Sequence, residues 1–245
     1  MFKSTFIIVF ISFAWNVWAQ NSEKDFRMIN RTYKAMESLS MDIDYKVYRN
    51  HESTTPIQTE NGTLKKKGDL YYYQIGSLVT IKASSYNLIV DNDAKTIALL
   101  NVEKGRDMAK DILLAISDSL LRNIKSISFA KINNTQNAYI LTSPNSEYAK
   151  IKIFFNVKSF FIEKLELYYK IPENFEDEES LDKEAPRVEI SYHDINTRPA
   201  FPSDLFTYAN FLRKEKNKYY CKEKYQGYHL IEQMKPATIS CNKDN

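Results

Sequence analysis

The sequence predicts an α+β protein that is mostly β, with antiparallel strands and a few helices packed against them. Most of the chain consists of short segments in which apolar and polar residues alternate, separated by turn residues. Parallel strands would need long crossovers between such segments, so the short connections favour antiparallel pairing. Seventeen Tyr and fourteen Phe against only five Gly also favour strands. Two further segments show the periodicity of amphipathic helices.

The N-terminal residues 1–19 have the pattern of a secretory signal. Lys3 precedes an apolar run over residues 6–18, and the small residue Ala19 follows it. This order predicts cleavage after Ala19 and export from the cytoplasm. The apolar run is too short and too interrupted for a membrane span, and no second run approaches that length. We therefore expect no transmembrane segment in the mature chain.

The first helix of the mature chain is predicted to begin near Ser22. Residues 22–25 resemble a capping box, with Asp25 in place of the usual Glu. An apolar stripe at three- and four-residue steps continues to about residue 37 and comprises Phe26, Ile29, Tyr33 and Met36. The period then changes to two over residues 41–47, which indicates a half-buried strand.

A meander of strands is predicted next, after a polar turn over residues 50–61. Turn signals at Gly68, Gly76 and residues 92–93 divide the segment. The predicted strands are 63–67, 70–74, 78–82, 87–91 and 96–102.

A second helix is predicted over residues 107–125, because its apolar residues fall four apart over a broad arc. Strands then resume at 126–132, 138–142, 148–156, 160–170 and 187–195. The acidic stretch 173–184 is interpreted as a solvated excursion between strands, with a cation site as the alternative. An irregular or helical piece over 202–213 and strands at 218–222 and 227–233 complete the chain.

Composition limits the domain count and the class of partner. Without a repeat or a linker rich in Pro or Gly, residues 20–245 are predicted to form a single domain. A net charge of +3 gives no electrostatic case for nucleic acid. Cys221 and Cys241 are predicted to form a disulfide in an oxidising compartment, with two unpaired thiols as the alternative.

Sequence motifs for catalysis are absent. The glycines form no phosphate-binding loop, and neither a G-x-S-x-G elbow nor an H-E-x-x-H motif occurs. His193 and Asp194 are adjacent on a predicted strand, so we expect their side chains to point to opposite faces. Asp42 and Asp44 have the spacing of a carboxylate or metal pair, but an exposed polar face is the simpler interpretation. Residues 91–93 are interpreted as a hairpin turn rather than a calcium loop. We therefore expect no enzyme activity, no metal and no cofactor.

The order of these elements resembles the LolA/LolB-like family of periplasmic lipoprotein carriers, in a divergent form such as Bacteroidota carry. Residues 62–73 (GTLKKKGDLYYY) and 88–100 (LIVDNDAKTIALL) are similar to two family segments, and residues 188–195 (VEISYHDI) are similar to a late family strand. The family has a cavity-side Arg in the first of these segments. Here Lys65, Lys66 or Lys67 occupies that neighbourhood.

This resemblance implies an incomplete antiparallel β-barrel, or half-barrel, whose concave face is lidded by helices. It also implies a periplasmic, non-enzymatic carrier that acts in lipoprotein sorting and holds the acyl chains of a lipid or an acylated protein. The predicted cavity wall consists of Ile43, Tyr45, Val47, Leu64, Val79, Ile81, Ile97 and Leu99. The predicted lid consists of Ile112, Ile116 and Leu120.

Two other interpretations fit the same sequence. The predicted wall and lid residues also fit an ordinary packed core. The tyrosines at 71–73 and 219–220 favour an interaction subunit of an envelope assembly that binds a protein partner, because exposed tyrosine is common at interfaces. A monomer is expected in either case.

Overall fold

The computed structural model describes residues 8–101, 124–144, 146–172, 184–216 and 218–233. One α-helix and fourteen strands lie in these ranges, with short 3₁₀ turns at Tyr208–Asn210 and Glu223–Tyr225. The elements are α1 (Ile8–Ala35), β1 (Ser38–Tyr48), β2 (Gln58–Lys67), β3 (Leu70–Ile75), β4 (Leu78–Lys82), β5 (Tyr86–Asp91), β6 (Thr96–Asn101), β7 (Ser126–Lys131), β8 (Gln136–Thr142), β9 (Tyr148–Asn156), β10 (Ile162–Tyr169), β11 (Arg187–Asn196), β12 (Leu212–Glu215), β13 (Lys218–Cys221) and β14 (His229–Gln233).

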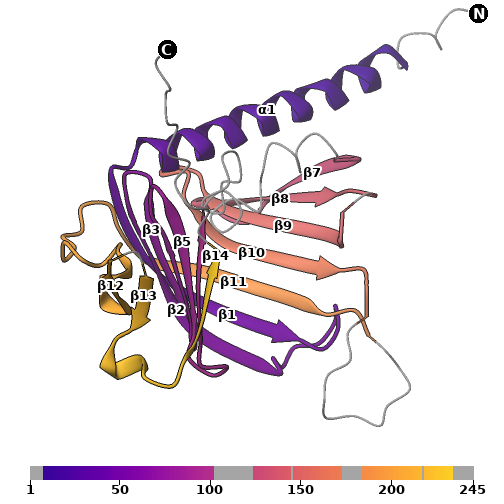
Figure 1. Cartoon of the computed structure of the whole chain (residues 1–245). Coiled ribbons are helices and arrows are strands. Elements are labelled where there is room, and N and C mark those ends of the chain that lie inside the picture. The colour runs from indigo at the N-terminus through magenta and orange to yellow at the C-terminus, as the bar shows by residue number, and fades with distance from the viewer. Residues whose placement is uncertain (1–7, 102–123, 145, 173–183, 217, 234–245) are drawn as a thin grey trace, which may run out of the picture.

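Twelve of these strands form one sheet in the order β14-β6-β5-β4-β3-β2-β1-β11-β10-β9-β8-β7, and β12 pairs with β13 in a second small sheet. Every neighbouring pair is antiparallel except β14 and β6, which are parallel. Figure 1 shows the large sheet curved, with β2, β3 and β5 on one side, β8, β9 and β10 on the other, and β1 and β11 between them. Among the described residues, β14 and β7 are edge strands and the sheet does not close, which confirms the predicted incomplete barrel.

Helix α1 runs across one end of the curved sheet, above β7 and β8 (Figure 1). Its buried stripe is the predicted one, with Phe26, Ile29 and Tyr33 each at most 4% exposed. The Phe26 ring lies 4.9 Å from that of Tyr139, and the Tyr33 ring contacts Phe161 edge-on at 5.4 Å. Burial of each such side chain contributes roughly 2 kcal/mol, so this stripe fixes the helix on the sheet.

The predicted start of this helix at Ser22 is wrong for the full chain, since α1 begins at Ile8. The apolar residues before Ser22 continue the helix without a break. Ser22 is therefore a buried residue in the helix interior and not an N-cap. Among the described residues, no helix combines the length and apolarity that a bilayer crossing requires.

Two buried clusters lie on the two faces of the large sheet. The first joins α1 to β1, β2 and β8–β11, and includes Ile29, Ile43 and Tyr192. The second joins β4–β6 to the segment around β12 and β13, and includes Ile81 and Leu212. We call the face that packs against α1 the helix-side face, and the other the outer face.

The predicted strands are confirmed, most within two residues at each end, and β2 starts earlier than predicted, at Gln58. The turns also form as predicted. Gly68 and Gly76 have positive φ angles of 58° and 50°. The Asp91 carboxylate accepts hydrogen bonds from the backbone amides of Asp93 and Ala94, so residues 91–93 form the expected hairpin turn. Residues 102–123 and 173–183 lie outside the described residues. These ranges include most of the second predicted helix (107–125) and most of the acidic stretch (173–184).

Candidate functional site

The helix-side face carries a continuous apolar row that the strand registers define. Residues directly opposite each other in an antiparallel pair share one face of the sheet. Tyr45 of β1 pairs with Ile190 of β11, which pairs with Leu165 of β10. The row continues through Ile153 and Tyr139 to Phe129 at the β7 edge. Every member of this row is apolar or aromatic.

Burial along this face falls with distance from α1. On β1, Leu39, Met41 and Ile43 are at most 1% exposed, whereas Tyr45 and Val47 are half-buried. The half-buried apolar side chains that pack against the first cluster on β1, β3 and β11 are Tyr45, Val47, Tyr71, Tyr73, Ile75, Ile190 and Ile195. We name five of them, Tyr45, Val47, Tyr73, Ile75 and Ile190, the half-buried apolar surface.

Tyrosine hydroxyls lie close to this surface. Burial, with a smaller contribution from the neighbouring Tyr45, raises the pKa of Tyr73 to about 12. Burial, followed by the proximity of Tyr33 and Tyr73, also raises the pKa of Tyr192. These phenols therefore remain neutral hydrogen-bonding groups at physiological pH. An apolar wall with a few fixed hydroxyls is the usual lining of a site for an amphiphile.

Lys66 connects this face to the end of α1. It is 6% exposed, and its ammonium group donates a hydrogen bond to the Met36 carbonyl. Burial lowers the pKa of Lys66, while Glu37 and Asp69 oppose that shift. Lys65 and Lys67 alternate with Lys66 along β2 and point to the outer face. Of the three lysines near the position of the family's cavity-side Arg, the structure therefore places Lys66 on the helix side.

The eight predicted wall residues do not share one face. Ile43, Tyr45, Val47 and Leu64 lie on the helix-side face, because Leu64 pairs with Met41. The other four, Val79, Ile81, Ile97 and Leu99, belong to the second cluster on the outer face. The helix-side positions of β4, β5 and β6 are Thr80, Ile89 and Ala98, which follow from Tyr73 through successive pairs.

The predicted wall residues fall on two faces because the sequence does not show which alternate residues of β4–β6 face α1. Side chains alternate at every residue, so the turn between β3 and β4 decides which set faces α1. The sequence around Gly76 and Ser77 does not reveal which set that is. The predicted lid residues Ile112, Ile116 and Leu120 lie outside the described residues.

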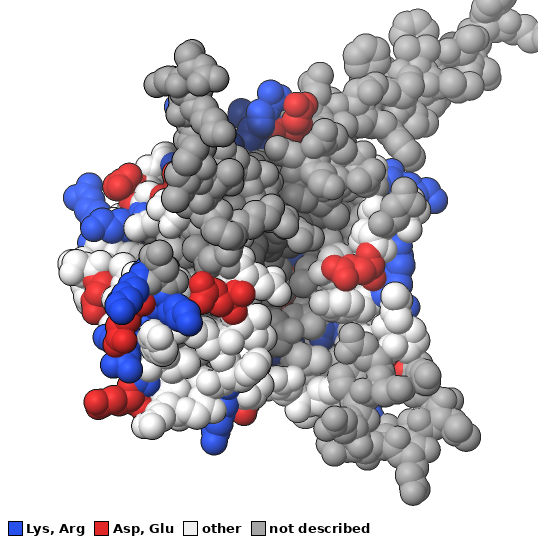
Figure 2. All heavy atoms as spheres, viewed as in Figure 1, with Lys and Arg blue, Asp and Glu red and all other residues white. Residues whose placement is uncertain are grey.

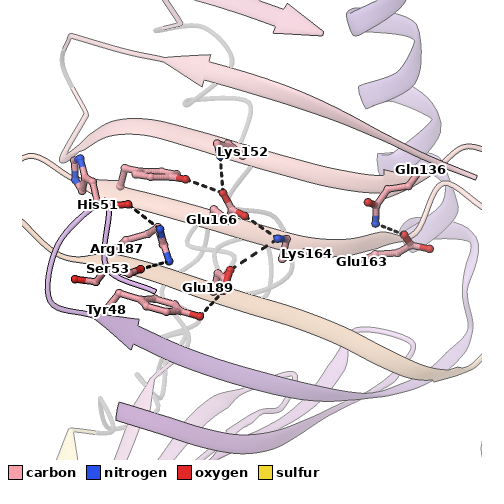
Figure 3. A network of polar contacts seen from close by, with 11 residues as sticks. Tyr48, His51, Ser53, Gln136, Lys152, Glu163, Lys164, Glu166, Arg187 and Glu189 are labelled. Atoms are coloured by element: carbon pink, nitrogen blue, oxygen red, sulfur yellow. Dashed lines mark hydrogen bonds and ion pairs between the residues drawn. The ribbon is translucent and has the colours of Figure 1, made fainter. Parts of the chain in front are cut away.

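A polar network covers the outer face of β9, β10, β11 and β1 (Figure 3). Glu166 contacts the ammonium groups of Lys164 at 2.7 Å and Lys152 at 2.9 Å, and it accepts a hydrogen bond from Tyr168 at 2.8 Å. On the next strand, Glu189 accepts a hydrogen bond from the Tyr48 hydroxyl at 2.7 Å. Lys164 also lies 3.8 Å from Glu189, so the network joins four adjacent strands.

Arg187 attaches the loop after β1 to the same face. Its guanidinium group donates to the carbonyls of His51 at 2.7 Å and Ser53 at 2.9 Å, as Figure 3 shows. The same group stacks over the Tyr48 ring, with its central carbon 4.1 Å from the ring centroid. Arg187 therefore acts as a structural clamp on this loop.

Glu166 is held ionised. Its burial favours a higher pKa, but the hydrogen bonds from Lys164, Lys152 and Tyr168 outweigh this effect and lower its pKa to about 2. A general acid or base works best with a pKa near the operating pH. Glu166 therefore serves the stability of the sheet rather than proton transfer.

A cluster of His193, Asp194, Asp42 and Asp44 lies on the outer face at the β1–β11 pair. The His193 ring nitrogens lie 2.9 Å from Asp194 and 3.3 Å from Asp44. Hydrogen bonds to Asp194 and then to Asp44 raise the pKa of His193. Asp42, His193 and Asp194 have ligand atoms within 4.8 Å of one another, and all three side chains are exposed.

The predicted separation of His193 and Asp194 onto opposite faces is wrong. The register of β1 and β11 shifts between Ser40 and Asp42, and Asp194 has a positive φ of 51°. Such an irregularity lets adjacent side chains turn toward the same side.

Cys221 is half-buried, and its sulfur lies 3.9 Å from the Tyr228 carbonyl. Cys241 lies outside the described residues, so the disulfide stays a prediction.

No protein-family model and no curated protein matches this chain. Solved structures do resemble it. A LolA superfamily protein from Nitrosomonas europaea is 11% identical and covers 74% of this chain and 96% of its own, with a TM-score of 0.33. A putative outer membrane lipoprotein-sorting protein domain from Vibrio parahaemolyticus is 12% identical and covers 76% and 96%, with a TM-score of 0.38.

The Pseudomonas aeruginosa MucA/MucB complex is also similar, with 9% identity, coverage of 75% of this chain and 60% of that chain, and a TM-score of 0.36. The chain is thus similar in structure to LolA-like proteins, the group that its sequence pattern resembles.

Proposed function

We propose that this protein is a non-enzymatic, exported binding protein that holds the acyl part of a lipid or an acylated protein against the helix-side face. The observation that carries the proposal is the half-buried apolar surface of Tyr45, Val47, Tyr73, Ile75 and Ile190. This surface adjoins the first buried cluster, and its side chains are apolar or aromatic like those of the cluster. Apolar side chains left half-buried on a curved sheet offer a ready contact for an apolar ligand.

The energetics favour an acyl chain. Each methylene group that leaves water contributes about 0.8 kcal/mol, so about ten of them contribute on the order of 8 kcal/mol before the costs of ordering. The neutral hydroxyl of Tyr73 adds a polar contact for the ester or amide that joins an acyl chain to its head group. Binding of this kind needs no catalytic group.

The proposed compartment is the periplasm, and it rests on the sequence. Lys3, the apolar run over 6–18 and Ala19 have the order of a cleavable signal. Cleavage after Ala19 would leave the buried stripe of α1 intact, because that stripe begins at Phe26.

The test compares two Ile→Asn variants by titration with a fluorescent fatty acid and with a diacylated lipopeptide. Ile190→Asn places an amide on the half-buried apolar surface. Ile140→Asn makes the same change at a half-buried position that faces outward, since Ile140 pairs with Lys152. We expect at least a tenfold loss of affinity for Ile190→Asn and no loss for Ile140→Asn.

Circular dichroism and thermal melts establish that both variants are folded. If Ile190→Asn is unfolded, Val47→Ser on the same surface replaces it. Equal affinities in the helix-side variant and the control, or no binding of either probe by the wild type, would contradict the proposal.

A second candidate function is the binding of a protein partner in an envelope assembly. The observation that favours it is the β7 edge of the sheet, where Ile127 is 41% exposed and the adjacent Ile132 is 46% exposed. An edge strand with exposed apolar side chains can accept a strand from another protein. A photocrosslinker at Ser128 of β7 should then yield one discrete adduct in intact cells, and a crosslinker at exposed Thr59 of β2 should yield none. Identical adduct patterns at both positions would exclude this function.

A further inference from the structure

The hairpin of β12 and β13, with the turn that follows it, concentrates the positive charge of the chain. Residues 212–224 contain six basic residues and two acidic ones, a net charge of +4, whereas the whole chain carries +3. The rest of the chain therefore carries a net charge of −1. The basic residues of this segment are Arg213, Lys214, Lys216, Lys218, Lys222 and Lys224, and all six are exposed. We call them, with Tyr220, the basic hairpin.

The hairpin is firmly attached to the sheet. Leu212 is 1% exposed and Phe211 is 7% exposed, and both belong to the second cluster. The backbone amide of Lys222 donates to the Phe211 carbonyl at 3.0 Å, and the Tyr225 ring packs against Phe211 with the ring centroids 5.2 Å apart. A rigidly held hairpin presents its charges in a fixed arrangement, which lowers the entropic cost of docking.

Within the part of the chain that the structure describes, Arg213 pairs with Glu215 at 3.1 Å, and the other five basic side chains of the hairpin make no ion pair. The basic side chains instead lie over tyrosine rings, with Arg213 over Tyr220 and Lys214 over Tyr219 at 5.6 and 5.2 Å from the ring centroids. Figure 2 shows Lys and Arg side chains, with acidic ones among them, over the side where Figure 1 places β12 and β13.

The outward face combines cations with an aromatic ring. Leu212 pairs with Cys221 and faces the sheet, so the alternate pairs, Arg213 with Tyr220 and Glu215 with Lys218, face away. Tyr220 is 41% exposed, although tyrosine offers a large apolar ring. Tyrosine flanked by Arg and Lys is the composition of segments that rest at the boundary between lipid and water.

We propose that the basic hairpin docks on the surface of an anionic lipid bilayer. Its charges are spread over both strands and the turn, and every basic side chain is exposed rather than drawn into a buried cradle, which suits an extended layer of lipid phosphates better than one small anion. Each basic side chain near an anionic surface is worth about 1 kcal/mol, or roughly a fivefold gain in partitioning. This docking is independent of the ligand that the helix-side face binds.

The experiment measures partitioning of the protein, purified from the periplasm, between buffer and sedimented vesicles. One vesicle type is pure phosphatidylcholine, and the other contains a quarter phosphatidylglycerol. The test variant is Lys214→Gln/Lys218→Gln/Lys222→Gln. The matched control is Lys125→Gln/Lys131→Gln/Lys158→Gln, which removes the same charge from exposed lysines at the β7–β9 end of the sheet.

We expect the wild type and the control to bind only the anionic vesicles, and the test variant to lose roughly 100-fold in partitioning. Binding should also weaken steeply between low and physiological salt. Equal binding to both vesicle types, or equal losses in the two triple variants, would overturn the proposal. Absence of vesicle binding together with binding of a poly-glutamate peptide would assign the hairpin to an acidic protein segment and would overturn it as well.

Discussion

Replacement of Glu166 by glutamine should destabilise the protein in a way that depends on pH. Glu166 is 7% exposed on the outer face, where its oxygens meet Lys152, Lys164 and the Tyr168 hydroxyl. Glutamine keeps the shape of the side chain and removes its charge. Two half-buried ammonium groups then lose the carboxylate that lies between them.

The magnitude follows from the pKa of Glu166. A fall from the ordinary value of 4.5 to about 2 corresponds to about 3 kcal/mol of stabilisation, at about 1.4 kcal/mol for each pKa unit. Because the folded-state pKa is the lower one, this contribution is present above pH 4.5 and is lost as the pH falls toward 2. The variant should therefore be less stable than the wild type by about 3 kcal/mol at pH 7, and by less than half of that near pH 3.

Urea unfolding followed by circular dichroism, at pH 7 and at pH 3, measures this difference. The control is Glu163→Gln on the same strand, where the carboxylate accepts hydrogen bonds from the Gln136 and Asn156 amides at 2.7 and 3.0 Å. With neutral donors only, we expect a loss of about 1 kcal/mol. A difference between Glu166→Gln and wild type that is the same at both pH values would refute the reasoning.

Three further predictions concern the helix-side face. Gly62→Ala should lower the free energy of unfolding by about 2 kcal/mol, because a Cβ there would lie 2.2 Å from the Gln74 carbonyl oxygen; an unchanged urea midpoint would contradict this. Tyr139→Phe should lower the free energy of unfolding by about 1 kcal/mol in a thermal melt, because it removes the hydrogen bond of 2.8 Å from Tyr139 to Asp25 that helps to hold α1. Tyr73→Phe should remove the tyrosinate absorbance that the wild type gains near pH 12 in a pH titration. If the variant instead lacks absorbance that the wild type gains near pH 10, the Tyr73 ring is exposed and the prediction is wrong.

Most of the fold could be predicted from local patterns. The strand at residues 148–156 can be predicted because Ile151, Ile153 and Phe155 recur at every second residue. The stripe of α1 was visible for the same kind of reason. The pairing of β14 alongside β6 in parallel could not be predicted, because it depends on the path of residues distant in sequence.

The faces of the strands were harder to predict than the strands themselves. Ile81 and Leu99 have the alternation of wall residues, yet they face the second cluster, because β12 and β13 supply a separate apolar cover for the outer face. No local pattern shows that the outer face of β4–β6 carries this apolar cover. The contact of His193 with Asp194 was missed for a related reason, since a bulge reverses the alternation without a glycine to mark it.

The proposal that the helix-side face holds an acyl chain is tested most directly by native mass spectrometry of the protein purified from its own periplasm without detergent. We predict a reproducible excess mass that denaturing solvent extracts as a lipid or a lipopeptide, and that is reduced in the Ile190→Asn variant but not in Ile140→Asn. A mass equal to that of the bare polypeptide, unchanged after incubation with acylated peptides, would contradict the proposal.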